Sequence, residues 1–133
     1  MSAPGQLTPA EQAIGSQTAT WAAREALLAA LLEVPGLRAY QMGDDLEPPA
    51  VLISPPRLTW KTASSQPSEA VFQVVLVVGA DERALERLDA LVPQAAAAID
   101  GSRVGVVLTA EPGTWDVGAI SLPAYFIETE VAL

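Results

Sequence analysis

One segment near the middle of the chain constrains the fold most, because it is apolar on both faces of the strand it predicts. Residues 69–78 read EAVFQVVLVV. One face carries an unbroken apolar row and the other an apolar row that Gln73 interrupts: Phe72, Val74, Leu76 and Val78 on the first, Val71, Val75 and Val77 on the second. A strand buried on both faces lies centrally in a sheet. We therefore expect helices on one face, and a loop, a terminus or a neighbouring subunit on the other.

Two segments with helical spacing of apolar residues predict the helices. The first begins at Thr18 or Thr20, either of which can cap it, and runs to about Val34, where Pro35-Gly36 ends it. Its predicted buried stripe contains Trp21, Leu27, Leu28, Leu31, Leu32 and Val34. Trp21 is accordingly predicted to be a core residue.

The second helix is predicted over about residues 81–100. Asp81 is a suitable N-cap and Gly101 a suitable terminator. Pro93 is expected to kink this helix or split it into two pieces. The predicted inner face contains Leu85, Leu88, Leu91, Val92, Ala95 and Ile99.

The remaining extended segments are predicted at 37–41, 50–54, 58–61, 103–109 and 122–131. Proline pairs at 48–49 and 55–56 bracket the second of these. In the last segment Glu128 and Glu130 share one face, which we expect to meet solvent or the lumen of an assembly. The element order α-β-β-β-β-α-β-β predicts the α+β class, with two helices packed on a single mixed sheet. Residues 18–133 form this domain, and residues 1–17 are expected to be an N-terminal arm.

The composition removes most catalytic chemistry. The chain of 133 residues has no His and no Cys, so imidazole bases, thiolates and ordinary zinc sites are excluded. Lys61 follows Trp60 rather than Gly, which rules out a phosphate-binding loop. Asp44, Asp45 and Glu47 lack the spacing of a calcium loop and predict a solvated acidic loop. We expect neither an enzyme nor a requirement for a metal or cofactor.

The charge and hydropathy pattern bounds the partners. Seven Lys and Arg against sixteen Asp and Glu give a net charge of −9, which argues against gripping a phosphate backbone. The apolar runs are too short to span a bilayer, and the N-terminus lacks the features of a signal peptide. We expect synthesis in the cytosol and no membrane association.

Contact residues are expected beside the loops. The stretch 62–68 (TASSQPS) predicts a hairpin tip that either becomes ordered against an adjacent subunit or another partner, or is an idle surface loop. Trp60 and Trp115 are each interpreted as either lids on the core or interface anchors. The candidate contact residues are Trp60, Lys61, Thr62, Ser64, Ser65, Gln66 and Trp115.

Three stretches together resemble a known family: PPAVLISPPRLTW, VFQVVLVVGADERALERLDALVPQAAAAID and AEPGTWDVGAISLPAYFIETEVAL. Over roughly residues 18–133 the chain looks like the tail terminator, or tail completion, proteins of long-tailed phages. It is most similar to those of phages that infect GC-rich actinobacteria. The resemblance implies a fold like that of the lambda U protein, a mixed sheet flanked by two helices.

The resemblance also implies a role in the virion. Members of the family form homo-hexameric rings that cap the completed tail tube at its head-proximal end and provide the head-to-tail joining surface. The implied partners are the tail tube protein and a head-tail connector, with genomic DNA passing through the lumen without specific binding. Assembly would take place in the host cytoplasm. Two alternatives remain open, a small-ligand-binding regulatory α+β domain and another phage connector protein.

Overall fold

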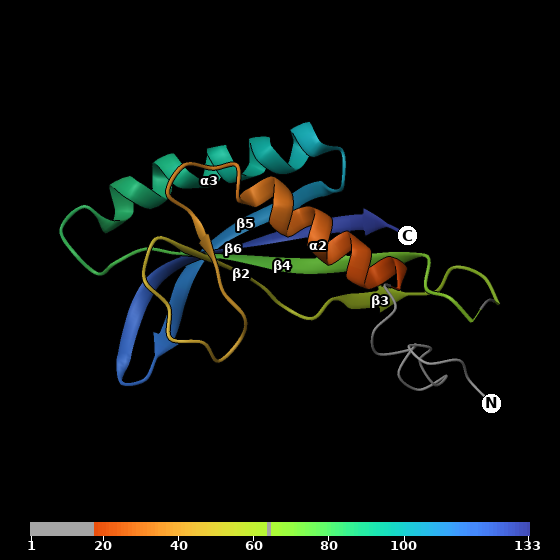
Figure 1. The fold of residues 1–133 in the computed structure, drawn as a ribbon, viewed down its shortest axis with the longest axis horizontal. Coiled ribbons are helices and arrows are strands. Elements are labelled where there is room, and N and C mark those ends of the chain that lie inside the picture. Colours follow the sequence, from red (N-terminus) through yellow and green to blue (C-terminus); the bar gives the residue numbers. More distant parts are fainter. Residues whose placement is uncertain (1–17, 64) are drawn as a thin grey trace, which may run out of the picture.

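The computed structural model describes residues 18–63 and 65–133, and the expectation for the arm at residues 1–17 lies outside this range. The described chain contains two helices and six strands (Figure 1). In chain order they are α2 (Ala19–Leu31), β1 (Arg38–Ala39), β2 (Ala50–Ile53), β3 (Arg57–Thr59), β4 (Glu69–Val77), α3 (Ala84–Ser102), β5 (Val106–Val117) and β6 (Ile120–Ala132). This is the predicted element order.

The strands form one mixed sheet in the order β1-β2-β4-β6-β5, with β3 also paired to β4. Only the β1–β2 pairing is parallel, and the others are antiparallel. β4 has partners along both sides, β6 on one and β2 and β3 on the other. The predicted α+β class and the central position of residues 69–78 are therefore confirmed.

Both helices cover the same face of this sheet (Figure 1). The main core lies between them and β4, where Phe72, Val74 and Leu76 are fully buried. Leu27 from α2 and Ile99 from α3 reach this core and are also inaccessible to solvent. The first apolar row of β4 is thus the floor on which the helices pack.

The end of the second apolar row of β4 that contains Val75 and Val77 is covered by the chain itself. Val75 and Val77 are buried in a smaller cluster with Leu46 from the loop after β1. Half-buried side chains close this cluster from the same loop and from the β5–β6 hairpin: Tyr40, Trp115, Val117, Leu122 and Phe126. Of the three covers expected for this face, the structure has a loop, supplemented by a hairpin.

The start of α2 agrees with the sequence, but its buried face does not. Thr18 is the N-cap, and its Oγ1 accepts a 3.0 Å hydrogen bond from the backbone N–H of Trp21. The helix ends at Leu31 rather than Val34. The prediction that Trp21 and Leu32 are buried is wrong, since they are 48% and 50% exposed.

The error arises because α2 carries two neighbouring apolar rows at helical spacing. The helix buries the row that includes Ala23, Leu27, Ala30 and Leu31, which its two alanines allow to approach other elements closely. Trp21 and Leu32 belong to the adjacent row. Periodicity alone merged the two rows into one stripe.

α3 begins and ends later than predicted. Asp81 lies in the turn before the helix, where its Oδ1 accepts a 2.8 Å hydrogen bond from the Arg83 N–H. Gly101 lies inside the helix, and Arg103 takes the left-handed C-cap conformation with φ of 59°. Leu85, predicted to face inward, is 78% exposed, and Ala84 is buried in its place.

Pro93 does not split α3, which continues through it to Ser102. A proline inside a helix costs about 3 kcal/mol because one hydrogen bond is lost and the ring crowds the preceding turn. Buried side chains anchor α3 to the sheet on both sides of Pro93: Ala84, Leu88 and Leu91 before it, Ala95 and Ile99 after it. This burial on both sides explains why the helix remains continuous.

The strand boundaries differ most in the last hairpin. The expected strands 103–109 and 122–131 are observed as Val106–Val117 and Ile120–Ala132, joined by a two-residue turn. Gly118 in this turn has φ of 61°, a conformation that glycine adopts readily. Gly113 lies under the Phe126 ring, and a Cβ there would come within 2.6 Å of a ring carbon. Pro112 is accepted because β5 is an edge strand.

The shorter strands also differ from expectation. The segments predicted at 37–41 and 58–61 are reduced to Arg38–Ala39 and Arg57–Thr59.

Within the described residues, no helix is both long enough and apolar enough to cross a membrane.

The contrast between two leucines on α3 gives a stability test. Leu88→Ala removes a side chain that is 2% exposed and should lower the free energy of unfolding by about 2–5 kcal/mol. Leu85→Ala, one turn away and 78% exposed, should change it by less than about 0.5 kcal/mol. Urea unfolding of both variants measures the difference. Equal losses would mean that the face of α3 has been assigned wrongly.

The turn before α3 predicts a pH dependence. A hydrogen bond from Arg87 and another from the Arg83 N–H lower the pKa of Asp81. Its contribution to stability is therefore complete above the unfolded-state pKa of about 3.9 and is lost as pH falls through the lower folded-state value. Asp81→Asn should destabilise the protein at pH 7, and its deficit should shrink as the pH falls below about 3.9. Thermal melts between pH 7 and pH 3 measure this, with Asp89→Asn, on the exposed side of α3, as the control.

Candidate interaction surfaces

The predicted tip follows β3 and carries most of the candidate contact residues. Trp60 is 50% exposed, and Thr62, Ser65 and Gln66 are exposed beside it. Lys61 forms an ion pair with Glu69 at the start of β4, and the hydrogen bond to that carboxylate raises the pKa of Lys61. Ser64 lies outside the described residues. The tip thus presents an aromatic side chain next to a paired charge.

Ser68 fixes the base of this tip. Its Oγ accepts a 2.9 Å hydrogen bond from the Lys61 N–H and donates a 3.0 Å bond to the Thr59 carbonyl. Its backbone N–H donates to the same carbonyl at 2.8 Å, and its own carbonyl accepts from the Leu133 N–H at 3.0 Å. Ser68 was expected to belong to the loose tip, but it joins β3, β4 and the C-terminus.

Trp115 is in a different place from the other candidates. It lies on β5, opposite Leu122, and its ring packs against the smaller core cluster. Its rung with Leu122 lies beyond the Val77 end of β4, whereas Trp60 lies beyond the Glu69 end of the same strand. Nine residues of β4 separate the two ends by about 30 Å. The structure therefore does not bring Trp60 and Trp115 together, and it favours the interpretation of Trp115 as a lid.

The β5–β6 hairpin extends past the end of β4 as an arm of residues 114–123 (Figure 1). The last rung shared with β4 is Val77–Ala124, and β5 and β6 continue pairing out to Val117–Ile120. Ile120, at the turn, is 61% exposed. This arm was not predicted from the sequence, although a glycine turn between alternating residues (TWDV-GA-ISLP) is a hairpin signal.

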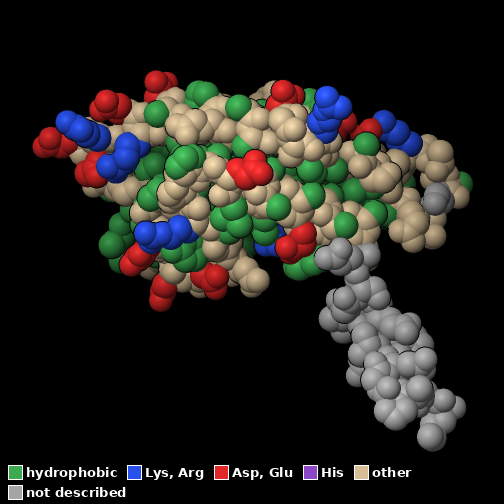
Figure 2. Space-filling model, turned by 45° about the horizontal axis from the view of Figure 1, so that its top comes forward, with side chains coloured by type: hydrophobic (Ala, Val, Ile, Leu, Met, Phe, Trp, Pro, Cys, Tyr) green, Lys and Arg blue, Asp and Glu red, His purple; other side chains and the backbone are tan. Residues whose placement is uncertain are grey.

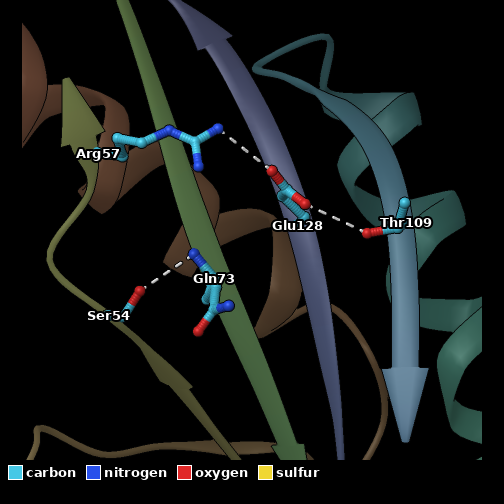
Figure 3. A network of polar contacts seen from close by, with 5 residues as sticks. All are labelled: Ser54, Arg57, Gln73, Thr109 and Glu128. Carbon is cyan, nitrogen blue, oxygen red and sulfur yellow. Dashed lines mark hydrogen bonds and ion pairs between the residues drawn. The ribbon is translucent and has the colours of Figure 1, made fainter. Parts of the chain in front are cut away.

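The face of the sheet that the helices leave open carries a polar network (Figure 3). Glu128 on β6 lies between two neighbours, accepting from Arg57 at 3.5 Å and from the Thr109 hydroxyl at 3.4 Å. Ser54 and Gln73 join the end of β2 to β4, with the Gln73 N–H donating to Ser54 Oγ at 3.1 Å. Arg57 on β3 is thereby linked across β4 to Glu128 on β6. Glu128 is in turn linked to Thr109 on β5.

Glu128 and Glu130 share this open face, as predicted from their alternation. Their rungs on β4 are Gln73 and Val71, the second row of that strand. Glu128 is held by Arg57 and Thr109 rather than by a second carboxyl group. The arrangement is a surface ion-pair network.

The acidic loop after β1 is partly tied to its neighbours. Asp44 accepts a 2.9 Å hydrogen bond from the Gln41 N–H, and Glu47 pairs with Arg38 at 2.6 Å. In the part of the chain that the structure describes, no group of three or more His, Cys, Asp or Glu is placed to hold a metal ion.

Basic side chains are mostly neutralised by nearby acids. Five of the seven Lys and Arg form ion pairs with Asp or Glu: Arg24, Arg38, Arg57, Lys61 and Arg87. On the face shown in Figure 2, the Lys and Arg side chains lie among Asp and Glu and do not gather into one patch.

No protein-family model matches the chain, and no curated protein matches it significantly.

These charges predict that the protein does not bind duplex DNA appreciably at physiological salt. A net charge of −9 repels phosphates, and the ion pairs leave few bases to replace counterions. Fluorescence anisotropy with a labelled duplex tests this. Micromolar binding that weakens steeply with added salt would reveal a basic surface, with Arg57, Lys61, Arg83 and Arg87 as the first residues to mutate.

Proposed function

We propose that the protein is a structural subunit of a phage tail, a tail terminator. Six copies form a ring that caps the finished tail tube at its head-proximal end and provides the surface that joins it to the head. The support is the sequence resemblance over residues 18–133 together with the mixed sheet and two helices. Those features agree with the fold that the resemblance implies.

One observation of the structure carries the assembly part of this proposal. The two ends of the sheet present different exposed apolar side chains, Trp60 beside the tip and Ile120 on the arm. When two non-identical surfaces of one subunit pair head to tail, each copy has one of each to offer, and the contacts can close into a ring. The tip end of one copy would meet the arm end of the next.

The open face of the sheet suits the lumen of such a ring. It carries Glu128 and Glu130, and the nearby Arg57 is engaged by Glu128. Acidic groups that face passing DNA disfavour contact with its phosphates, so the genome could slide without specific binding. The helices would then face outward.

The other partners follow from the same arrangement. The tail tube protein would meet one rim of the ring and the head-tail connector the other. The exposed residues of the tip, Thr62, Ser65 and Gln66, are the proposed contacts to the tube or to the adjacent subunit, with Ser64 between them. This role needs neither a metal nor a cofactor.

Paired surface variants test the ring. Trp60→Ser and Ile120→Ser should each abolish assembly alone, because each removes one half of the same contact. Mixed in equal amounts they should form dimers, since each supplies the surface that the other lacks. Leu85→Ser, which alters an exposed leucine on α3, is the matched control and should assemble like the wild type. Light scattering of the purified proteins gives the masses.

Electron microscopy of tails tests the location. Six copies are expected at the head-proximal end. For a protein that is monomeric when free, the Trp60→Ser, Ile120→Ser and Leu85→Ser variants are compared by the number of copies bound to each tail tube. A single bound copy, or a ring of another order, would contradict the proposal. A ring at another level of the neck would instead favour another connector protein.

A further inference from the structure

An apolar groove lies beside the first turns of α2. It has a volume of about 350 Å³ and is lined mainly by Trp21, Met42, Ile53, Pro55, Pro56 and Phe72. Ile53 and Phe72 form its floor and are 3% and 0% exposed. Trp21 and Met42 line it as well, yet they remain 48% and 44% exposed.

Two large apolar side chains bordering one groove are an unusual surface feature. Exposed apolar area is unfavourable by roughly 25 cal/mol per Å², and contiguous apolar patches mark contact sites. The Arg24 guanidinium lies 4.9 Å from the centre of the Trp21 ring, where it forms a cation–π contact. The described residues leave about half of the Trp21 side chain exposed.

The nearest chain that could fill the groove is the segment before α2. Residues 1–17 lead directly into the N-cap Thr18, three residues before Trp21. Seventeen residues can extend about 55 Å, far more than the groove requires. The segment contains two branched apolar residues, Leu7 and Ile14, and one acidic residue, Glu11, which complements the charge of Arg24 at the groove.

We propose that residues 1–17 fold back onto this groove in their own subunit, with Leu7 and Ile14 covering Trp21 and Met42 and Glu11 near Arg24. Direct attachment favours the same subunit over a second copy. Closing a short loop costs little entropy, whereas association of separate molecules costs several kcal/mol or more of lost translational and rotational freedom. This contact does not depend on ring formation or on any role in a tail.

The exposure of Trp21 to a quencher tests the proposal in the full-length chain. Trp60→Phe and Trp115→Phe leave Trp21 as the only tryptophan, and acrylamide then reports its accessibility. Adding Leu7→Ser and Ile14→Ser should raise the quenching constant about twofold, because the covered ring becomes half exposed. Gln6→Ser with Gln12→Ser, at neighbouring positions in the same segment, is the matched control and should leave quenching unchanged.

Dilution distinguishes coverage of Trp21 by residues 1–17 of the same subunit from coverage by those of a second copy. Protection by the same subunit should persist over about a thousandfold dilution, whereas protection by a second copy should be lost by mass action. Loss on dilution, or equal quenching in the Leu7/Ile14 and Gln6/Gln12 variants, would overturn the proposal.

A second readout covers the case in which Trp115→Phe unfolds the chain. The indole N–H signal of Trp21 can be assigned by NMR in the otherwise unaltered protein, through its loss in Trp21→Phe. It should shift in the Leu7/Ile14 variant and stay in place in the Gln6/Gln12 variant. An unchanged signal in both variants would again overturn the proposal.

Discussion

Burial of β4 on both faces is the constraint on which the rest of the structure depends. One row of its side chains, including Phe72 and Leu76, requires two helices, and these must lie on the same face to share one core. The other row, Val75 and Val77, requires a second cover at one end of the strand. The loop after β1 and the β5–β6 hairpin supply that cover, so the positions of most elements follow from one strand.

The second cover ends where the polar part of the open face begins. Past Val75 the second row of β4 contains Gln73, and the neighbouring strands contribute Arg57, Thr109 and Glu128 instead of apolar side chains. This face therefore has a closed apolar end and an open polar end. In the proposed ring, the polar end is the surface that DNA would pass. The apolar end anchors the arm that would reach the next subunit.

Four of the exposed apolar side chains fall into two groups, one placed for the proposed contact between subunits and the other for the proposed docking of residues 1–17. Trp60 and Ile120 lie at opposite ends of the sheet, as a head-to-tail contact requires. Trp21 and Met42 line a groove beside the point where the N-terminal segment joins α2. The first pair suits a neighbouring subunit, while the second suits the chain's own residues.

The sequence by itself determined the class, the order of the elements and the central strand. These depend on local spacing and on burial of both faces of one segment, which a linear pattern records. It also narrowed the N-cap of α2 to Thr18 or Thr20, of which Thr18 is the observed cap, because capping is a local hydrogen bond.

The tertiary structure alone decided which of two apolar rows α2 buries, where α3 begins and how far the last hairpin extends. Choosing between the Leu27 row and the Trp21 row depends on which row another element meets, and that element is distant in sequence. At Gly113 in β5, the Phe126 ring of the partner strand lies where a Cβ would be, a contact that the local sequence does not reveal. The separation of Trp60 from Trp115 likewise follows from strand register, which is a property of pairing and not of either segment.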